Sequence, residues 1–118
     1  MPNNLDITEI SATLRQFASD RNWNQFHSPK NLSMALNVEA AELLEHFQWL
    51  TEQESLTLDD NKRDAVATEI ADVLIYLIRI SDILKIDLND AVHSKMALNS
   101  EKYPVEKVYG SSKKYTEY

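Results

Sequence analysis

The chain has 118 residues, so we expect one domain, with residues 105–118 as a C-terminal arm. One glycine and three prolines are too few turn-formers for an all-β fold, and the absence of cysteine excludes disulfides, zinc–thiolate sites and a thiol nucleophile. The formal net charge of −7 argues against a nucleic-acid partner. Neither a signal peptide nor a membrane span is apparent, so we expect a cytoplasmic protein with no membrane partner.

Apolar residues at three- and four-residue spacing predict helices over 6–21, 31–50, 61–84 and 88–102, with a short helical turn within 51–60. Asp6 or Thr8 suits the first N-cap, Asp59 or Asp60 the third and Asp87 the fourth, which ends before Pro104. The loop after the first helix contains large aromatic residues. They either close the end of a helix bundle or contact a ligand.

These four helices with modest loops predict an all-α fold, a four-helix-bundle protomer. The third helix has apolar residues on nearly every side, which is typical of a helix that is central or covered by another subunit. A chain this short buries only about two-thirds of the surface that it exposes when unfolded, so further apolar surface favours assembly. We therefore expect a homodimer or homotetramer.

Two acidic pairs stand within apolar helix faces. Glu39 and Glu42 lie three residues apart on the second helix, and Glu69 and Asp72 have the same spacing on the third. Isolated carboxylates in apolar surroundings are costly unless they are paired, protonated or metal-bound, and basic residues are scarce on these faces. The pattern predicts a site for a hard cation held by oxygen ligands, Mg²⁺ or Mn²⁺.

Other metal chemistries fit the sequence less well. A di-iron bundle needs Glu-x-x-His motifs, and the chain has none. Glu45 points to another side of the second helix, and we interpret it as a surface or intersubunit residue. His46 lies one turn beyond Glu42 and is interpreted as a packed or surface histidine.

With E-A-A-E at 39–42 and E-I-A-D at 69–72, the chain resembles the MazG-like all-α nucleotide pyrophosphohydrolases, and within them the dCTP pyrophosphatase branch. Further stretches carry the resemblance: RNWNQFHSPKNL (21–32), EAAELLEHFQWL (39–50), EIADVLIYL (69–77), SKMALNSEKYP (94–104) and SSKKYTEY (111–118). The resemblance implies Mg²⁺-dependent hydrolysis of a nucleoside triphosphate, best guessed as dCTP or a related pyrimidine dNTP, to the monophosphate and pyrophosphate in nucleotide-pool cleansing.

The resemblance also implies roles for individual residues. The metal ligands would be Glu39, Glu42, Glu69 and Asp72, with Glu39 or Glu42 acting on the attacking water. The nucleotide pocket would use Trp23, His27, Asn31, Trp49 and Tyr76. Phosphates or sugar would be bound by Lys95, Asn99, Lys102 and Tyr103, some of them from a neighbouring subunit.

The competing hypothesis is a non-catalytic helical interaction module whose acids hold a structural metal ion. A structural ion would not need two tryptophans, a histidine and a downstream lysine around it. Release of pyrophosphate from a nucleotide would separate the two hypotheses.

Overall fold

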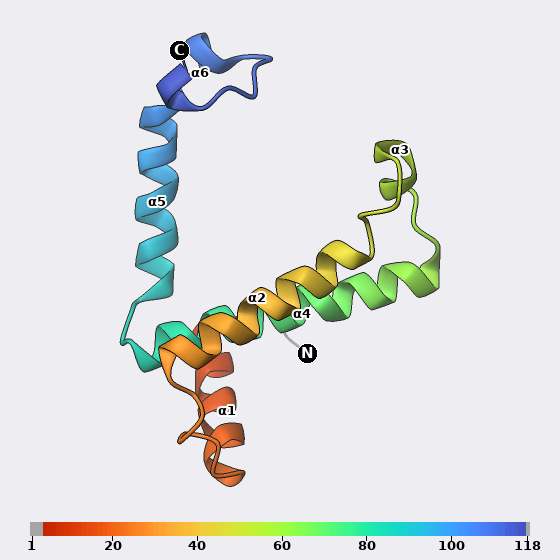
Figure 1. Cartoon of the computed structure of the whole chain (residues 1–118). Coiled ribbons are helices and arrows are strands. Elements are labelled where there is room, and N and C mark those ends of the chain that lie inside the picture. The colour runs from red at the N-terminus through yellow and green to blue at the C-terminus, as the bar shows by residue number, and fades with distance from the viewer. Residues whose placement is uncertain (1–3, 118) are drawn as a thin grey trace. The chain divides into compact units, whose positions relative to one another are not determined.

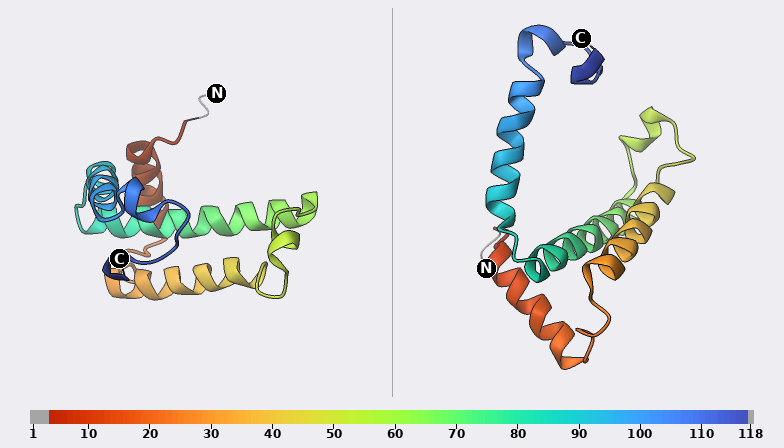
Figure 2. Two further views of the ribbon diagram at one scale, coloured as in Figure 1. Left: turned by 90° about the horizontal axis from the view of Figure 1, so that it is seen from above. Right: turned by 60° about the vertical axis from the view of Figure 1, so that its left-hand side comes forward.

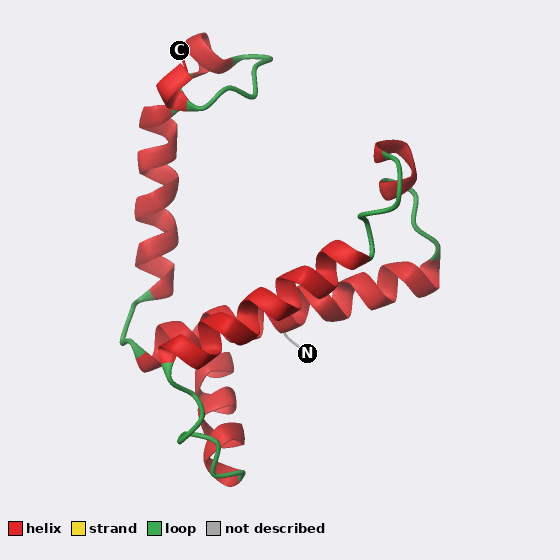
Figure 3. Cartoon of the chain, in the orientation of Figure 1, coloured by secondary structure: helices red, strands yellow, loops and turns green. Residues whose placement is uncertain are grey.

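The computed structural model describes residues 4–117, and in this range it contains helices and loops but no strand (Figure 3). The predicted all-α class is therefore confirmed. The chain forms two compact units, Met1–Ile86 and Asp87–Tyr118. None of the helices in the described range is long and apolar enough to cross a membrane.

The first unit is organised around two long helices that lie side by side. The helices α2 (Pro29–Glu45) and α4 (Asp60–Ile83) are joined through the short helix α3 (Glu52–Ser55), and α1 (Ile7–Asp20) packs against α4 (Figures 1 and 2). This arrangement places α1 and α3 at opposite ends of the α2–α4 pair (Figure 1).

Local side-chain chemistry explains where these helices begin and end. The carboxylates of Asp6, Asp59 and Asp87 each accept a hydrogen bond from the backbone N–H three residues later, which confirms these predicted N-caps. At their C-terminal ends, α1 and α4 close with residues in the left-handed region, Asn22 at φ 54° and Lys85 at φ 58°. Such a residue lets the chain satisfy the last carbonyls of the helix and turn away.

The second helix is shorter than predicted. It was expected to reach Leu50 but ends at Glu45, and turns follow over residues 46–49. The backbone N–H groups of His46 and Phe47 bond to carbonyls three residues back, which tightens the chain. Thr51 then starts α3 with a capping box that it forms with Glu54. No proline or glycine stands at this end of the helix, so the apolar periodicity of the sequence predicted a longer helix.

The buried core of the single chain is small. Among the described residues its buried apolar side chains are Ala18, Leu32, Val66 and Ile78. Large apolar residues remain exposed along α4, notably Ile70, Leu77 and the C-cap residue Leu84, which are spaced by seven along one helical face. The prediction that another subunit covers α4 remains a prediction, and the exposed stripe is what it would cover.

The second unit contains α5 (Leu88–Lys102), which matches the predicted helix, then α6 (Val105–Val108) and a 3₁₀ turn at Tyr115–Glu117. The ring of Tyr115 meets Tyr103 edge-on at 6.1 Å between centroids, and the Lys102 Nζ lies 4.8 Å from the same ring. The predicted arm therefore packs on the end of α5. A four-helix bundle that includes α5 stays a prediction, as does the single-domain assignment.

Candidate metal centre and adjoining pocket

The acidic residues of α2 and α4 converge. Carboxylate oxygens of Glu39, Glu69 and Asp72 all lie within 4.8 Å of one another. The side-by-side packing of the two helices brings the pairs together, because residues three apart on each helix face the same neighbour. Three of the four predicted metal ligands thus meet at one point.

Two oxygens in this cluster are buried without a hydrogen-bond partner, the Oε2 atoms of Glu39 and Glu69. Burial raises the pKa of Glu39 to about 7, assisted by a hydrogen bond with Glu42 and by the negative charges of Glu42, Asp72 and Glu69. Burial likewise raises the pKa of Glu69, again assisted by Glu42. The fourth predicted ligand, Glu42, therefore lies beside the other three.

The cluster lacks a basic partner. Within residues 4–117 the ion pairs join Arg15 to Asp82 and Arg79 to Asp82, and neither involves these acids. His46, interpreted from the sequence as a packed or surface histidine, is close enough for its charge to lower the pKa of Glu69. Orphaned buried oxygens, mutual repulsion and an all-oxygen donor set fit a hard divalent cation.

An apolar cavity of about 230 Å³ opens between α1, the following loop, α2 and α4. Three predicted pocket residues line it, Trp23, His27 and Tyr76, and they are joined by Leu14, Phe17, Leu32, Ile75 and Arg79. The Trp23 ring meets Phe17 edge-on at 5.7 Å between centroids. Trp23 and His27 of the loop therefore form part of the cavity wall, which favours ligand contact over simple closure of the bundle end.

Tyr76 connects the cavity with the acidic cluster. It lines the cavity, and burial together with the charges of Glu39, Asp72 and Glu42 raises its pKa. Asn31, by contrast, supports the loop: its Nδ2 donates to the Phe26 carbonyl at 3.1 Å. A ligand in the cavity would thus reach toward the acids past Tyr76.

Arg79 is the residue of this site that sequence reasoning missed. It interrupts the apolar run of α4, yet its side chain is only 7% exposed and lines the cavity. Its Nη2 donates to Asn24 Oδ1 at 2.7 Å and its Nε to His27 Nδ1 at 3.2 Å. A buried guanidinium in an otherwise apolar helix is costly, and this was the available signal.

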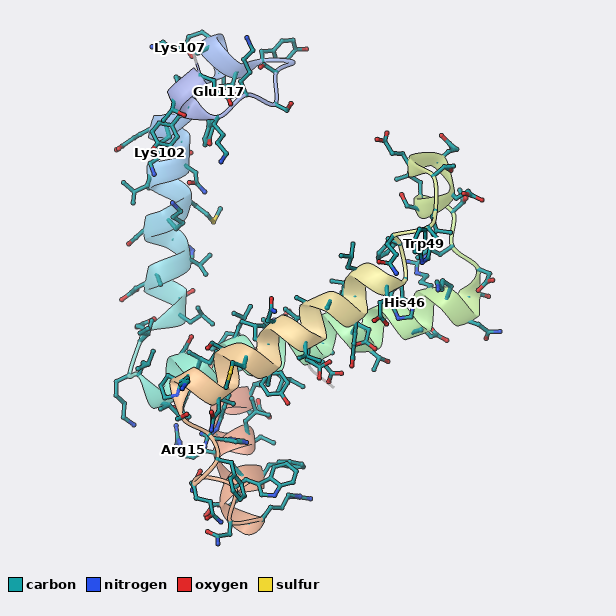
Figure 4. The ribbon with its side chains drawn as sticks, in the orientation of Figure 1. Arg15, His46, Trp49, Lys102, Lys107 and Glu117 are labelled. Carbon is teal, nitrogen blue, oxygen red and sulfur yellow. The ribbon has the colours of Figure 1, made fainter. Side chains whose placement is uncertain are left out.

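Six predicted substrate-binding residues do not line this cavity, and Asn31, which supports the loop, is one of them. Trp49 is 87% exposed and lies just beyond α2, at the α3 end of the unit (Figure 4). Since α2 has 17 residues and is about 25 Å long, Trp49 and Trp23 do not flank one base within a single chain. The remaining four belong to the second unit: Lys95, Asn99, Lys102 and Tyr103. Lys95 and Asn99 are exposed on α5.

Known proteins with similar sequences match most of this chain. A sequence model of the MazG-like family matches residues 34–118. The chain is 43% identical over 114 residues to human dCTP pyrophosphatase 1 and 42% identical to the mouse protein of that name, in each case over 95% of this chain and 65% of the relative. It thus spans just under two thirds of the length of these relatives.

A solved structure shows the same fold. The crystal structure of a pyrophosphatase from Archaeoglobus fulgidus superimposes with a TM-score of 0.79 at 39% sequence identity, covering 88% of this chain and 97% of that one.

Proposed function

The chain belongs to the MazG-like family, and from this premise we propose that it hydrolyses a deoxynucleoside triphosphate to the monophosphate and pyrophosphate. The names of its relatives favour dCTP or a related pyrimidine dNTP as substrate. The observation that carries the proposal is the cluster of unpaired acids next to an aromatic-lined cavity. Removal of unwanted nucleotides in the cytoplasm is the role that we infer for this reaction.

We propose that Glu39, Glu42, Glu69 and Asp72 hold Mg²⁺, with Mn²⁺ as a second possible ion. When bound, such an ion neutralises the polyphosphate and polarises the scissile phosphorus. The two carboxylates of α2 are the candidates to orient and deprotonate the attacking water.

The cavity supplies binding for the base. Trp23 and Tyr76 offer aromatic surface, and stacking of a base on an aromatic ring is worth about 1–3 kcal/mol. Asn31 holds the loop that carries Trp23 and His27. The base would lie in the cavity and the triphosphate would extend past Tyr76 toward the acids.

We propose further that Lys95, Asn99, Lys102 and Tyr103 bind phosphates or sugar, and that the enzyme is a homodimer or homotetramer. Lysine is a suitable point charge for phosphate. The exposed apolar stripe of α4 and the small core of the single chain support assembly. Trp49, exposed at the α3 end of the unit, is then a candidate to reach a neighbouring subunit's site.

A nucleotide panel tests the activity. The full chain is incubated with each dNTP and NTP in the presence of Mg²⁺, and pyrophosphate and orthophosphate are measured separately. We expect pyrophosphate with the monophosphate, and highest turnover with a pyrimidine dNTP. Orthophosphate without pyrophosphate would contradict cleavage between the α- and β-phosphates, and no turnover would leave the structural-metal module as the better explanation.

Conservative variants test the acids. Glu42→Gln and Asp72→Asn remove one charge each and should abolish Mg²⁺-dependent turnover while the helical circular dichroism stays unchanged. Glu45→Gln is the matched control, since Glu45 is an exposed acid on the same helix, outside the cluster. Full activity in both cluster variants would refute the metal assignment.

A further inference from the structure

Arg79 gives the cavity a polar edge that carries only hydrogen-bond donors. Its three hydrogen bonds, to Asn24, His27 and Asp82, use three of the five N–H groups of the guanidinium. One N–H on each terminal nitrogen therefore has no acceptor among residues 4–117. Because arginine has no acceptor atom and is always protonated, this edge of the cavity can only donate.

The same contact fixes the state of His27. Its Nδ1 accepts the Arg79 Nε–H at 3.2 Å, so the ring proton resides on Nε2, where it is a second donor. Burial and the Arg79 charge lower the pKa of His27, which keeps the ring neutral in this tautomer. Both residues line the cavity, and its other walls are mostly apolar.

Arg79 shares its counter-ion with a second guanidinium. Its Nη1 lies 3.3 Å from Asp82 Oδ2, and Asp82 in turn accepts two hydrogen bonds from Arg15, at 2.8 and 3.1 Å. One carboxylate thus faces two guanidinium groups, and the group of three residues keeps a net positive charge. Arg79 also offers a ligand direction, because three hydrogen bonds fix the guanidinium at the edge of the cavity.

Resting on the proposed function, we propose that Arg79, together with the His27 that it orients, selects bases that present two adjacent acceptors. Cytosine does so with O2 and N3, whereas thymine and uracil carry a hydrogen on N3 that would face the donors. A base with a mismatched edge leaves buried donors unpaired, which is more costly than the lost bond alone. Arg79 is then a specificity-determining residue.

Two base analogues test this on the unaltered protein. The first is 3-deaza-dCTP, which replaces the N3 acceptor by C–H, and the second is the 2-pyrimidinone analogue, which keeps O2 and N3 but lacks the amino group. We expect kcat/KM for 3-deaza-dCTP to fall about 10- to 100-fold below dCTP, the range of one hydrogen bond to a charged group. The 2-pyrimidinone analogue should stay within about threefold of dCTP, since both acceptors that meet the donors remain.

Arg79→Met, which keeps the length of the side chain but removes all donors, should abolish the difference between dCTP and 3-deaza-dCTP. Arg63→Met is the control, because Arg63 is exposed on the same helix away from the cavity, and it should keep that difference. Nitrogen-15 NMR of His27 should show the Nε2–H tautomer in the parent and a tautomer mixture in Arg79→Met.

A failure of the Arg79 proposal can be distinguished from a failure of the proposed function. Equal turnover of dCTP and 3-deaza-dCTP by the parent would overturn the role of Arg79, whether or not Arg79→Met folds. Retention of the parent preference by a folded Arg79→Met would overturn it as well. A parent that releases pyrophosphate from no nucleotide would refute the proposed function instead.

Discussion

Lowering the pH from 8 to 6 should weaken binding of Mg²⁺ at the acidic cluster. A carboxylate must lose its proton before it can ligate a metal ion. With a pKa of about 7, Glu39 is about 90% ionised at pH 8 and about 10% ionised at pH 6. The apparent affinity should therefore fall about tenfold over this range, and further where Glu69, whose pKa is also raised, takes part.

Isothermal titration calorimetry without nucleotide measures this directly. Titrations of Mg²⁺ in two buffers of different ionisation enthalpy give both the affinity and the number of protons released. We expect about one proton per ion at pH 6 and about a tenth of a proton at pH 8, from Glu39 alone. Glu45→Gln should behave like the parent, while Glu39→Gln should bind weakly with no such release. An affinity that changes less than twofold between pH 6 and pH 8 would refute the reasoning.

Four further predictions follow from the same structure. Since the pKa of Glu39 is raised on folding, its contribution to stability is lost as pH rises from 4.5 to about 7, so metal-free Glu39→Gln should melt above the parent at pH 8 and not at pH 4. Ile78→Ala should lower the unfolding free energy by about 2–5 kcal/mol in urea titrations. Trp23→Ala should raise KM for the dNTP by about 5- to 150-fold, the factor that corresponds to a loss of about 1–3 kcal/mol of base stacking. Leu77→Glu should shift the mass measured by light scattering toward the monomer, and an unchanged mass would count against the α4 stripe as an interface.

Features that depend on neighbouring residues could be predicted from the sequence. The helix starts at Asp6, Asp59 and Asp87 rest on bonds between residues three apart, so the local pattern contains them. The acidic cluster was predictable for a related reason, since charged residues inside an apolar stripe are costly without a partner.

Features that depend on tertiary contacts could not be predicted in this way. Arg79 meets His27 and Asn24 across 52 and 55 residues of sequence, and no local pattern joins them. The end of α2 at Glu45 is set by the turns before Thr51 rather than by a glycine or proline. Trp23 precedes α2 and Trp49 follows it, so the length of the helix separates the two tryptophans that were expected in one pocket.

The division of the acids between α2 and α4 has a mechanical consequence. Without a cation, and at a pH where these acids are ionised, their like charges repel one another across the contact between the two helices. At the proposed metal site, a bound ion attracts carboxylates from both helices and so replaces their repulsion by attraction to a shared cation. The ion would then stabilise the contact between α2 and α4. Addition of Mg²⁺ should therefore slow amide hydrogen exchange along both helices.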